Sequence, residues 1–145
     1  MKPKQMELIR IAKRVKKAIK PFYSFALFVN TRLESVSPYT DTINLIYDLV
    51  TYFDDAKDQL MSAFGLEQVR YEIQIGRIEP YGIVKEITKQ ALNLIKMADR
   101  ILAKTNGKHT GMPNKDDLLK AYLNLEEHIV LLIVWFNSYL NHMYN

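Results

Sequence analysis

The sequence contains no cysteine and only five glycines and five prolines among its 145 residues. The absence of cysteine excludes disulfide bonds and thiolate metal sites, which is compatible with a reducing cytoplasm but does not fix the compartment. The low content of glycine and proline, together with abundant Ile, Leu, Lys and Tyr, suits a compact α-helical protein.

The chain also lacks a long apolar run and a targeting segment. Its longest unbroken apolar run, Ile129–Phe136, is far shorter than the roughly 20 residues that a membrane-spanning helix needs. The basic N-terminal residues are not followed by the apolar block and small-residue cleavage site of a signal peptide. We therefore expect a soluble, unprocessed protein with no membrane partner.

Charge is distributed unevenly along the chain. The net charge is +4, but eight basic residues and one acidic residue give residues 1–20 a charge of +7, which leaves −3 for the remainder. This polarity predicts an oriented interaction with an anionic surface, and nucleic acid, phospholipid and an acidic protein patch all fit it. The plain alternative is a lysine-rich face that is only solvated.

The basic segment has the spacing of an amphipathic helix. Apolar residues recur three and four apart between Gln5 and Lys20, and Pro21 predicts a kink or break after them. We therefore expect a basic arm at residues 1–20, ahead of an aromatic stretch that stays helical to about Glu34. The predicted partner-binding residues are Arg10, Lys13, Arg14, Lys16, Lys17 and Lys20.

Apolar seams predict three further helices. One follows the Ser37-Pro38 restart and ends at Gly65, a second begins near Val84 and closes at Asn106-Gly107, and the last is capped by Asn114. Residues 66–78 alternate like a strand but have no evident partner strand, and we favour helix there over an extended connector.

These seams predict an all-α fold, and the 48% hydrophobic content is enough for a real core. We expect one domain over residues 1–145, a bundle of about four helices preceded by the basic N-terminal helix or arm. The run Ile129–Phe136 is apolar on every side, so the other helices should surround it. An exposed flank there would instead indicate an oligomer or partner surface.

The sequence offers little catalytic chemistry. Glu126 and His128 are two residues apart and point to different sides of a helix, so they do not form the paired Glu-x-x-His of a bundle metal site. The tail Asn137–Tyr144 resembles the Arg-Asn-x-x-x-His-x-Tyr pattern of the HEPN ribonucleases, but Asn137 replaces the catalytic arginine. We therefore expect no enzyme, no metal and no cofactor.

Taken together, the segment Lys13–Lys17, the Tyr- and Ile-rich seams and the terminal helix over Ile129–Tyr144 resemble the small helical-bundle proteins of archaeal bicaudaviruses. This resemblance covers the whole chain in length and architecture. It implies a viral protein of the host cytoplasm that lodges in the DNA-binding channel of the host RNA polymerase, restrains the mobile clamp and blocks template loading. The alternative that it implies is a virion component or nucleic-acid-coating protein.

A polymerase channel that holds DNA is largely positive, whereas this protein is basic as a whole. The charge split suggests a solution in which the acidic body occupies the channel and the basic arm reaches acidic patches nearby. The acidic residues that would face the channel cations are Asp48, Asp54, Asp55 and Asp58. A housekeeping nucleic-acid-binding protein is the third interpretation, and salt-sensitive DNA binding without polymerase preference would distinguish it.

Overall fold

Four α-helices contain nearly all of the residues that the structure describes. The structure is a computed structural model that describes residues 3–35, 43–66, 80–103 and 113–144. The helices are α1 (Pro3–Ser35), α2 (Ile43–Phe64), α3 (Pro80–Ala103) and α4 (Lys115–Tyr144). Within these ranges there is no strand, so the predicted all-α helical bundle is confirmed.

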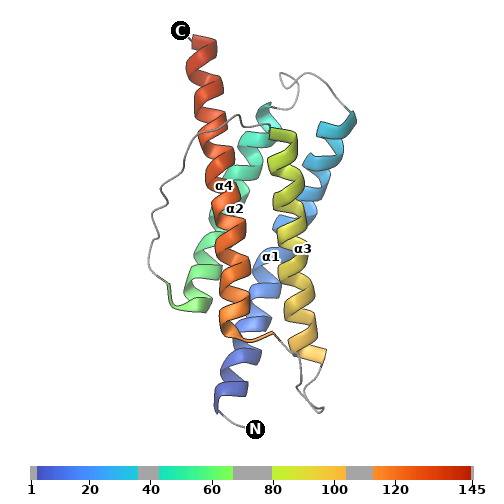
Figure 1. The fold of residues 1–145 in the computed structure, drawn as a ribbon, viewed down its shortest axis with the longest axis vertical. Helices are drawn as coiled ribbons and strands as arrows, with labels where there is room; N and C mark the ends of the chain where they lie inside the picture. The colour runs from blue at the N-terminus through green and yellow to red at the C-terminus, as the bar shows by residue number, and fades with distance from the viewer. Residues whose placement is uncertain (1–2, 36–42, 67–79, 104–112, 145) are drawn as a thin grey trace.

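The helices form a bundle in which every adjacent pair is antiparallel. Helix α1 packs against α2 and α3, and α4 packs against the same two helices from the opposite corner. Figure 1 shows α1 and α4 running in one direction and α2 and α3 in the other. The end of α2 and the start of α3 therefore lie at opposite ends of the bundle. The predictions for residues 67–78, for the Ser37-Pro38 restart and for Asn106-Gly107 fall on residues outside the described ranges.

The α1–α3 interface is the most extensive in the bundle. Three contacts set its register, from Glu34 with Tyr81, through Ala26 with Thr88, to Lys16 with Asp99. The buried Thr88 hydroxyl lies 3.3 Å from the Ala26 carbonyl oxygen, an approach that small side chains at the interface permit. At the exposed end, the Tyr81 hydroxyl donates to Glu34 Oε1 at 3.1 Å, and this hydrogen bond raises the pKa of Tyr81.

Helix α1 runs through Pro21 without a break, so of the predicted kink or break the break is wrong. The physical reason is tertiary packing, because Ile19 and Phe22 on either side of the proline are fully buried while Pro21 itself is exposed.

The predicted basic arm is not confirmed either. Residues 3–20 are the first half of α1, and their apolar side belongs to the common core.

Helix α2 ends at Gly65 as predicted. Gly65 has a φ of +68°, a left-handed conformation that glycine adopts without strain. Its N–H donates to the Ser62 carbonyl at 3.2 Å, and the Leu66 N–H donates to the Met61 carbonyl at 2.9 Å. This pair of bonds is a Schellman motif, which satisfies carbonyls that the last turn would leave unpaired. Along α2, Leu49 is buried and Val50 is only half-buried.

Helix α4 begins at the predicted cap. The Asp117 N–H donates to Asn114 Oδ1 and the Asn114 N–H donates to Asp117 Oδ2, both at 2.9 Å. The two residues thus form a reciprocal capping box, and Asp116 and Asp117 place negative charge in the first turn, where the helix dipole favours it.

The second half of α4 departs from the prediction. Ile129 and Leu132 are buried, but the other six residues of the run that ends at Phe136 are only half-buried. The other helices therefore cover this run only in part. Figure 1 shows that α4 extends beyond the ends of the other three helices and has no neighbour along its last turns.

Replacing Pro21 with alanine tests the account of α1. Because the helix already continues through this position, Pro21→Ala restores a backbone donor and removes a steric conflict. We expect the free energy of unfolding to rise by up to about 3 kcal/mol. Thermal unfolding followed by circular dichroism measures the change, and a lower melting temperature would contradict a continuous α1.

The α4 cap gives a second stability test. Asn114→Ala removes the side-chain half of the capping box, which should lower the free energy of unfolding by about 1 kcal/mol. The matched control is Asn93→Ala, because Asn93 is exposed in the middle of α3 and alanine is the better helix former there. Equal stabilities of the two variants in urea unfolding would show that the cap is not formed.

Candidate partner-binding surface

The predicted partner-binding residues form a ridge along the first half of α1. Five of the six are exposed, and we call these five the basic ridge. With a rise of 1.5 Å per residue, the ridge is about 15 Å long. Its members are Arg10, Lys13, Arg14, Lys17 and Lys20.

The sixth predicted residue, Lys16, lies apart from the basic ridge. Its side chain turns toward α3 and is 33% exposed, and its Nζ lies 2.6 Å from Asp99 Oδ1. A half-exposed pair of this kind contributes at most about 1 kcal/mol to stability, yet it neutralises Lys16 locally. Lys16 therefore belongs to the α1–α3 interface, and sequence spacing alone could not place Asp99 beside it.

The opposite side of the same helical turns is the core. Ile11, Ala12, Val15 and Ile19 are at most 1% exposed, and Ala18 is 5% exposed. Because these residues pack into the cluster that all four helices share, the backbone of the basic ridge is fixed relative to the bundle. A partner would meet a preformed row of cations, without the entropic cost of ordering a loose arm.

The helix that neighbours the basic ridge carries exposed acidic residues. All four predicted acidic residues of α2 are exposed, and the Phe22–Phe53 ring contact at 5.2 Å sets α1 and α2 side by side. Between them is a groove of about 420 Å³, lined by Arg14, Lys17, Asp58, Gln59 and Ser62. Asp58 of α2 therefore lies beside Arg14 and Lys17 of the basic ridge.

The aromatic stretch after Pro21 divides into core and surface. Phe22 is fully buried and contacts Phe53, whereas Phe28 is 51% exposed. Between these extremes, the half-buried Phe25 stacks on Tyr52 of α2 with ring centroids 5.1 Å apart. The sequence analysis did not identify the exposed Tyr52, whose position on the surface of α2 could be found only from the phase of the helix.

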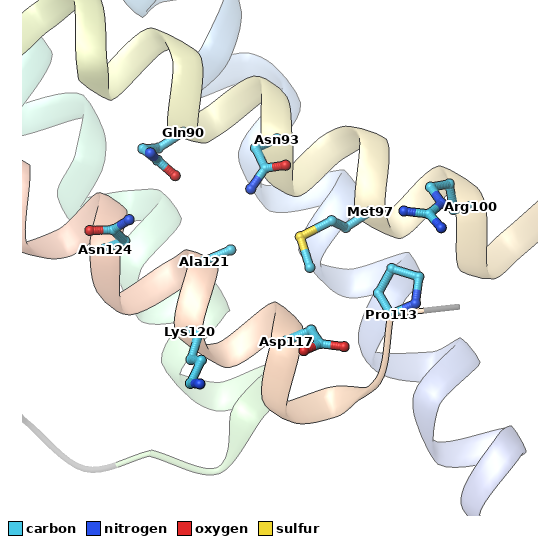
Figure 2. A pocket seen from close by; sticks show the side chains of 9 residues that line it. All are labelled: Gln90, Asn93, Met97, Arg100, Pro113, Asp117, Lys120, Ala121 and Asn124. Carbon is cyan, nitrogen blue, oxygen red and sulfur yellow. The ribbon is translucent and has the colours of Figure 1, made fainter. Parts of the chain in front are cut away.

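A second groove lies between α3 and α4 and has a volume of about 410 Å³. Figure 2 shows Met97 reaching across it from α3 toward α4. Two of its polar side chains are engaged within the protein, since Gln90 Nε2 donates to Glu86 Oε1 at 2.9 Å and Asp117 belongs to the α4 cap. The full lining is Gln90, Asn93, Met97, Arg100, Pro113, Asp117, Lys120, Ala121 and Asn124.

Glu126 and His128 point in different directions, as their two-residue spacing predicts. Glu126 is 2% exposed and its Oε1 lies 3.9 Å from Lys57 Nζ in the α2–α4 interface. His128 Nδ1 lies 2.7 Å from the Asn124 carbonyl oxygen of its own helix. In the described parts of the chain, no group of three His, Cys, Asp or Glu residues is placed to hold a metal ion.

Comparison of this chain with known protein families, sequences and structures gives no functional information. No protein-family model, no curated protein sequence and no solved structure matches this chain. A search of the described helices finds none that is both long enough and apolar enough to cross a membrane.

Alanine substitutions of two phenylalanines test which rings of the aromatic stretch are buried. Phe22→Ala empties a fully buried site and should lower the free energy of unfolding by about 3–5 kcal/mol, whereas Phe28→Ala at the surface should cost less than about 1 kcal/mol. Urea unfolding measures both changes. A large loss in the Phe28 variant would mean that this ring is covered in the folded protein.

Proposed function

We propose that this protein acts by binding and not by catalysis, and that it inhibits transcription as a viral protein bound to the host's archaeal RNA polymerase. The observation that carries the proposal is the basic ridge of α1, which is anchored in the core and has Asp58 of α2 beside it. The identity of the partner rests on the resemblance of the whole chain to bicaudavirus helical-bundle proteins.

The charge arrangement is compatible with binding in a channel built for DNA. Such a channel presents cations to the phosphates of DNA. The exposed carboxylates of α2 would face these cations. The basic ridge lies about one helix width away, where it would contact acidic patches on the channel wall or clamp. A bundle held by both signs of charge would resist opening and closing of the clamp and would occupy the space of the template.

A second candidate function is favoured by the same ridge. Five exposed cations over about 15 Å also suit phosphates, so a nucleic-acid-coating or virion role remains the competing proposal. This candidate makes a quantitative prediction. With at most about five phosphate contacts, DNA affinity should fall by about 500-fold between 50 and 200 mM salt.

Promoter-directed transcription with purified archaeal RNA polymerase separates the two functions. An inhibitor should suppress transcription at near-stoichiometric amounts, and excess non-promoter DNA should not relieve the suppression because the protein binds the enzyme. A coating protein would be titrated away by the added DNA. Full transcription at a severalfold excess of protein over polymerase would overturn the proposed inhibition.

Neutralising the basic ridge tests which surface carries the binding. The test variant neutralises four of the five ridge residues, and the control removes the same charge from exposed lysines of α3 and α4. The test substitutions are Arg10→Gln, Lys13→Gln, Lys17→Gln and Lys20→Gln. The control substitutions are Lys85→Gln, Lys89→Gln, Lys96→Gln and Lys120→Gln.

We expect the ridge variant to bind polymerase at least about tenfold more weakly, because rim charges of this kind supply electrostatic attraction to an acidic surface. The control variant should bind like the unmodified protein. Retention of polymerase on immobilised protein measures both affinities. Equal weakening in the two variants would show that net charge matters and that the ridge does not.

A further inference from the structure

The outward side of α3 carries a row of cations beside α1. Lys85, Lys89 and Lys96 are exposed and follow one another at spacings of four and seven residues, so they lie on one side of the helix. Lys85 is three residues before Thr88, which contacts α1. Lys96 is likewise three residues before Asp99, which also contacts α1. The three lysines therefore border the α1–α3 interface.

Three lysines of the basic ridge border the same interface from the other helix. Lys13 and Lys20 are three residues before and four residues after Lys16, the α1 residue that pairs with α3. Lys17 lies between them and is also exposed. Because α1 and α3 run in opposite directions, Lys20 and Lys96 lie at the same level of the bundle.

The two sets of lysines form one track that crosses from α1 to α3. Its two halves meet at the level of Lys20 and Lys96. Because Tyr81 contacts Glu34, Lys85 lies about level with residue 30 of α1, and the track is therefore about 25 Å long. We call the following six residues the lysine track: Lys13, Lys17, Lys20, Lys85, Lys89 and Lys96.

The carboxylates of α1 and α3 are engaged within the protein. Helix α1 has eight basic and two acidic residues, and α3 has four basic and two acidic residues. Each of the four carboxylates contacts a side chain that can donate to it, so the excess of positive charge faces solvent. The four contacts are Lys16–Asp99, Lys115–Glu7, Tyr81–Glu34 and Gln90–Glu86.

The chemistry of the lysine track identifies its ligand. Protein interfaces are enriched in arginine and aromatic residues and depleted in lysine, and the track consists of lysine alone. A lysine ammonium is a compact point charge that binds a phosphate without the planar, bidentate geometry by which arginine recognises specific groups. Contacts of this kind hold the backbone of a nucleic acid and carry no sequence information.

The surroundings of the track favour duplex DNA over other polyanions. Sites for single strands place aromatic rings among their cations, but the exposed ring of Phe28 contacts Phe25, which stacks on Tyr52 of α2. A helix that lies on a membrane keeps an apolar side for the acyl chains, whereas the apolar sides of α1 and α3 are buried in the core. A duplex carries about one charge per 1.7 Å of its axis, so it supplies phosphates along the whole track.

We propose that the lysine track is a binding site for duplex DNA, which it holds by the phosphates without regard to sequence. The bound duplex would lie across the α1–α3 interface, whose contacts fix the two halves of the track relative to each other. The inference does not rest on the proposed inhibition of polymerase, and it adds α3 to the surface that a nucleic-acid-coating protein would use.

The test neutralises the α3 half of the track in the full chain and leaves the basic ridge unchanged. The test substitutions are Lys85→Gln, Lys89→Gln and Lys96→Gln. The control removes the same charge from exposed positions at the start of α1 and in the first half of α4. The control substitutions are Lys4→Gln, Lys115→Gln and Lys120→Gln. A third variant has arginine at the three α3 positions and keeps the charge, and circular dichroism checks that all variants remain helical.

Fluorescence anisotropy of a labelled duplex of about 24 base pairs measures the dissociation constant between about 50 and 200 mM salt. We expect the unmodified protein to bind two unrelated sequences equally. The α3 glutamine variant should bind at least about tenfold more weakly, and the slope of log affinity against log salt should fall by about three, one for each lysine removed. The control and the arginine variant should keep the slope of the unmodified protein.

Three results would overturn the proposal. Equal weakening in the α3 glutamine variant and the control would show that only net charge matters. Absence of duplex binding by the unmodified protein would show that the track is a solvated surface. Tighter binding of a single strand of the same length, or of vesicles of anionic phospholipid, would assign the track to another ligand. Retention of polymerase involves no DNA and should not change in the α3 glutamine variant, so this proposal and the proposed inhibition fail separately.

Discussion

Burial of one side of α1 along its whole length is the constraint on which the rest of the structure depends. The fully buried Ile19 and Phe22 hold the helix on both sides of Pro21, and the contacts from Lys16–Asp99 to Glu34–Tyr81 align it with α3. A local penalty of about 3 kcal/mol at the proline is outweighed because several large side chains lose their water contacts at once. One continuous helix results, and its outer side becomes a fixed surface.

The same constraint determines where the charged residues of α1 lie. Because the apolar side of α1 is committed to the core, its cations form a single outward row, and antiparallel packing brings Asp58 of α2 beside Arg14 and Lys17. The surface of the bundle thus carries cations and a carboxylate close together, so it can attract groups of either charge. At the opposite end, α4 extends past its neighbours, and its sequence from Ile129 onward contains no Asp, Glu, Lys or Arg.

The features that depend on local residue spacing could be predicted from the sequence. The helical class, the Gly65 end of α2 and the Asn114 cap of α4 follow from periodicity and from backbone chemistry within a few residues. Features that depend on the length and position of neighbouring helices could not be predicted. Continuity through Pro21, the pairing of Lys16 and the incomplete covering of α4 all require knowledge of what lies beside each segment.

The most direct test of the central claim is amide hydrogen exchange of the full chain, read out segment by segment. If α1 is one helix packed along its length, the amides of Ile11–Lys20 should exchange as slowly as those of Ile87–Ile95 in the middle of α3, since both segments bury one side in the same core. Exchange of Ile11–Lys20 at the rate of an unstructured peptide would contradict the account, because the basic residues would then belong to a loose arm.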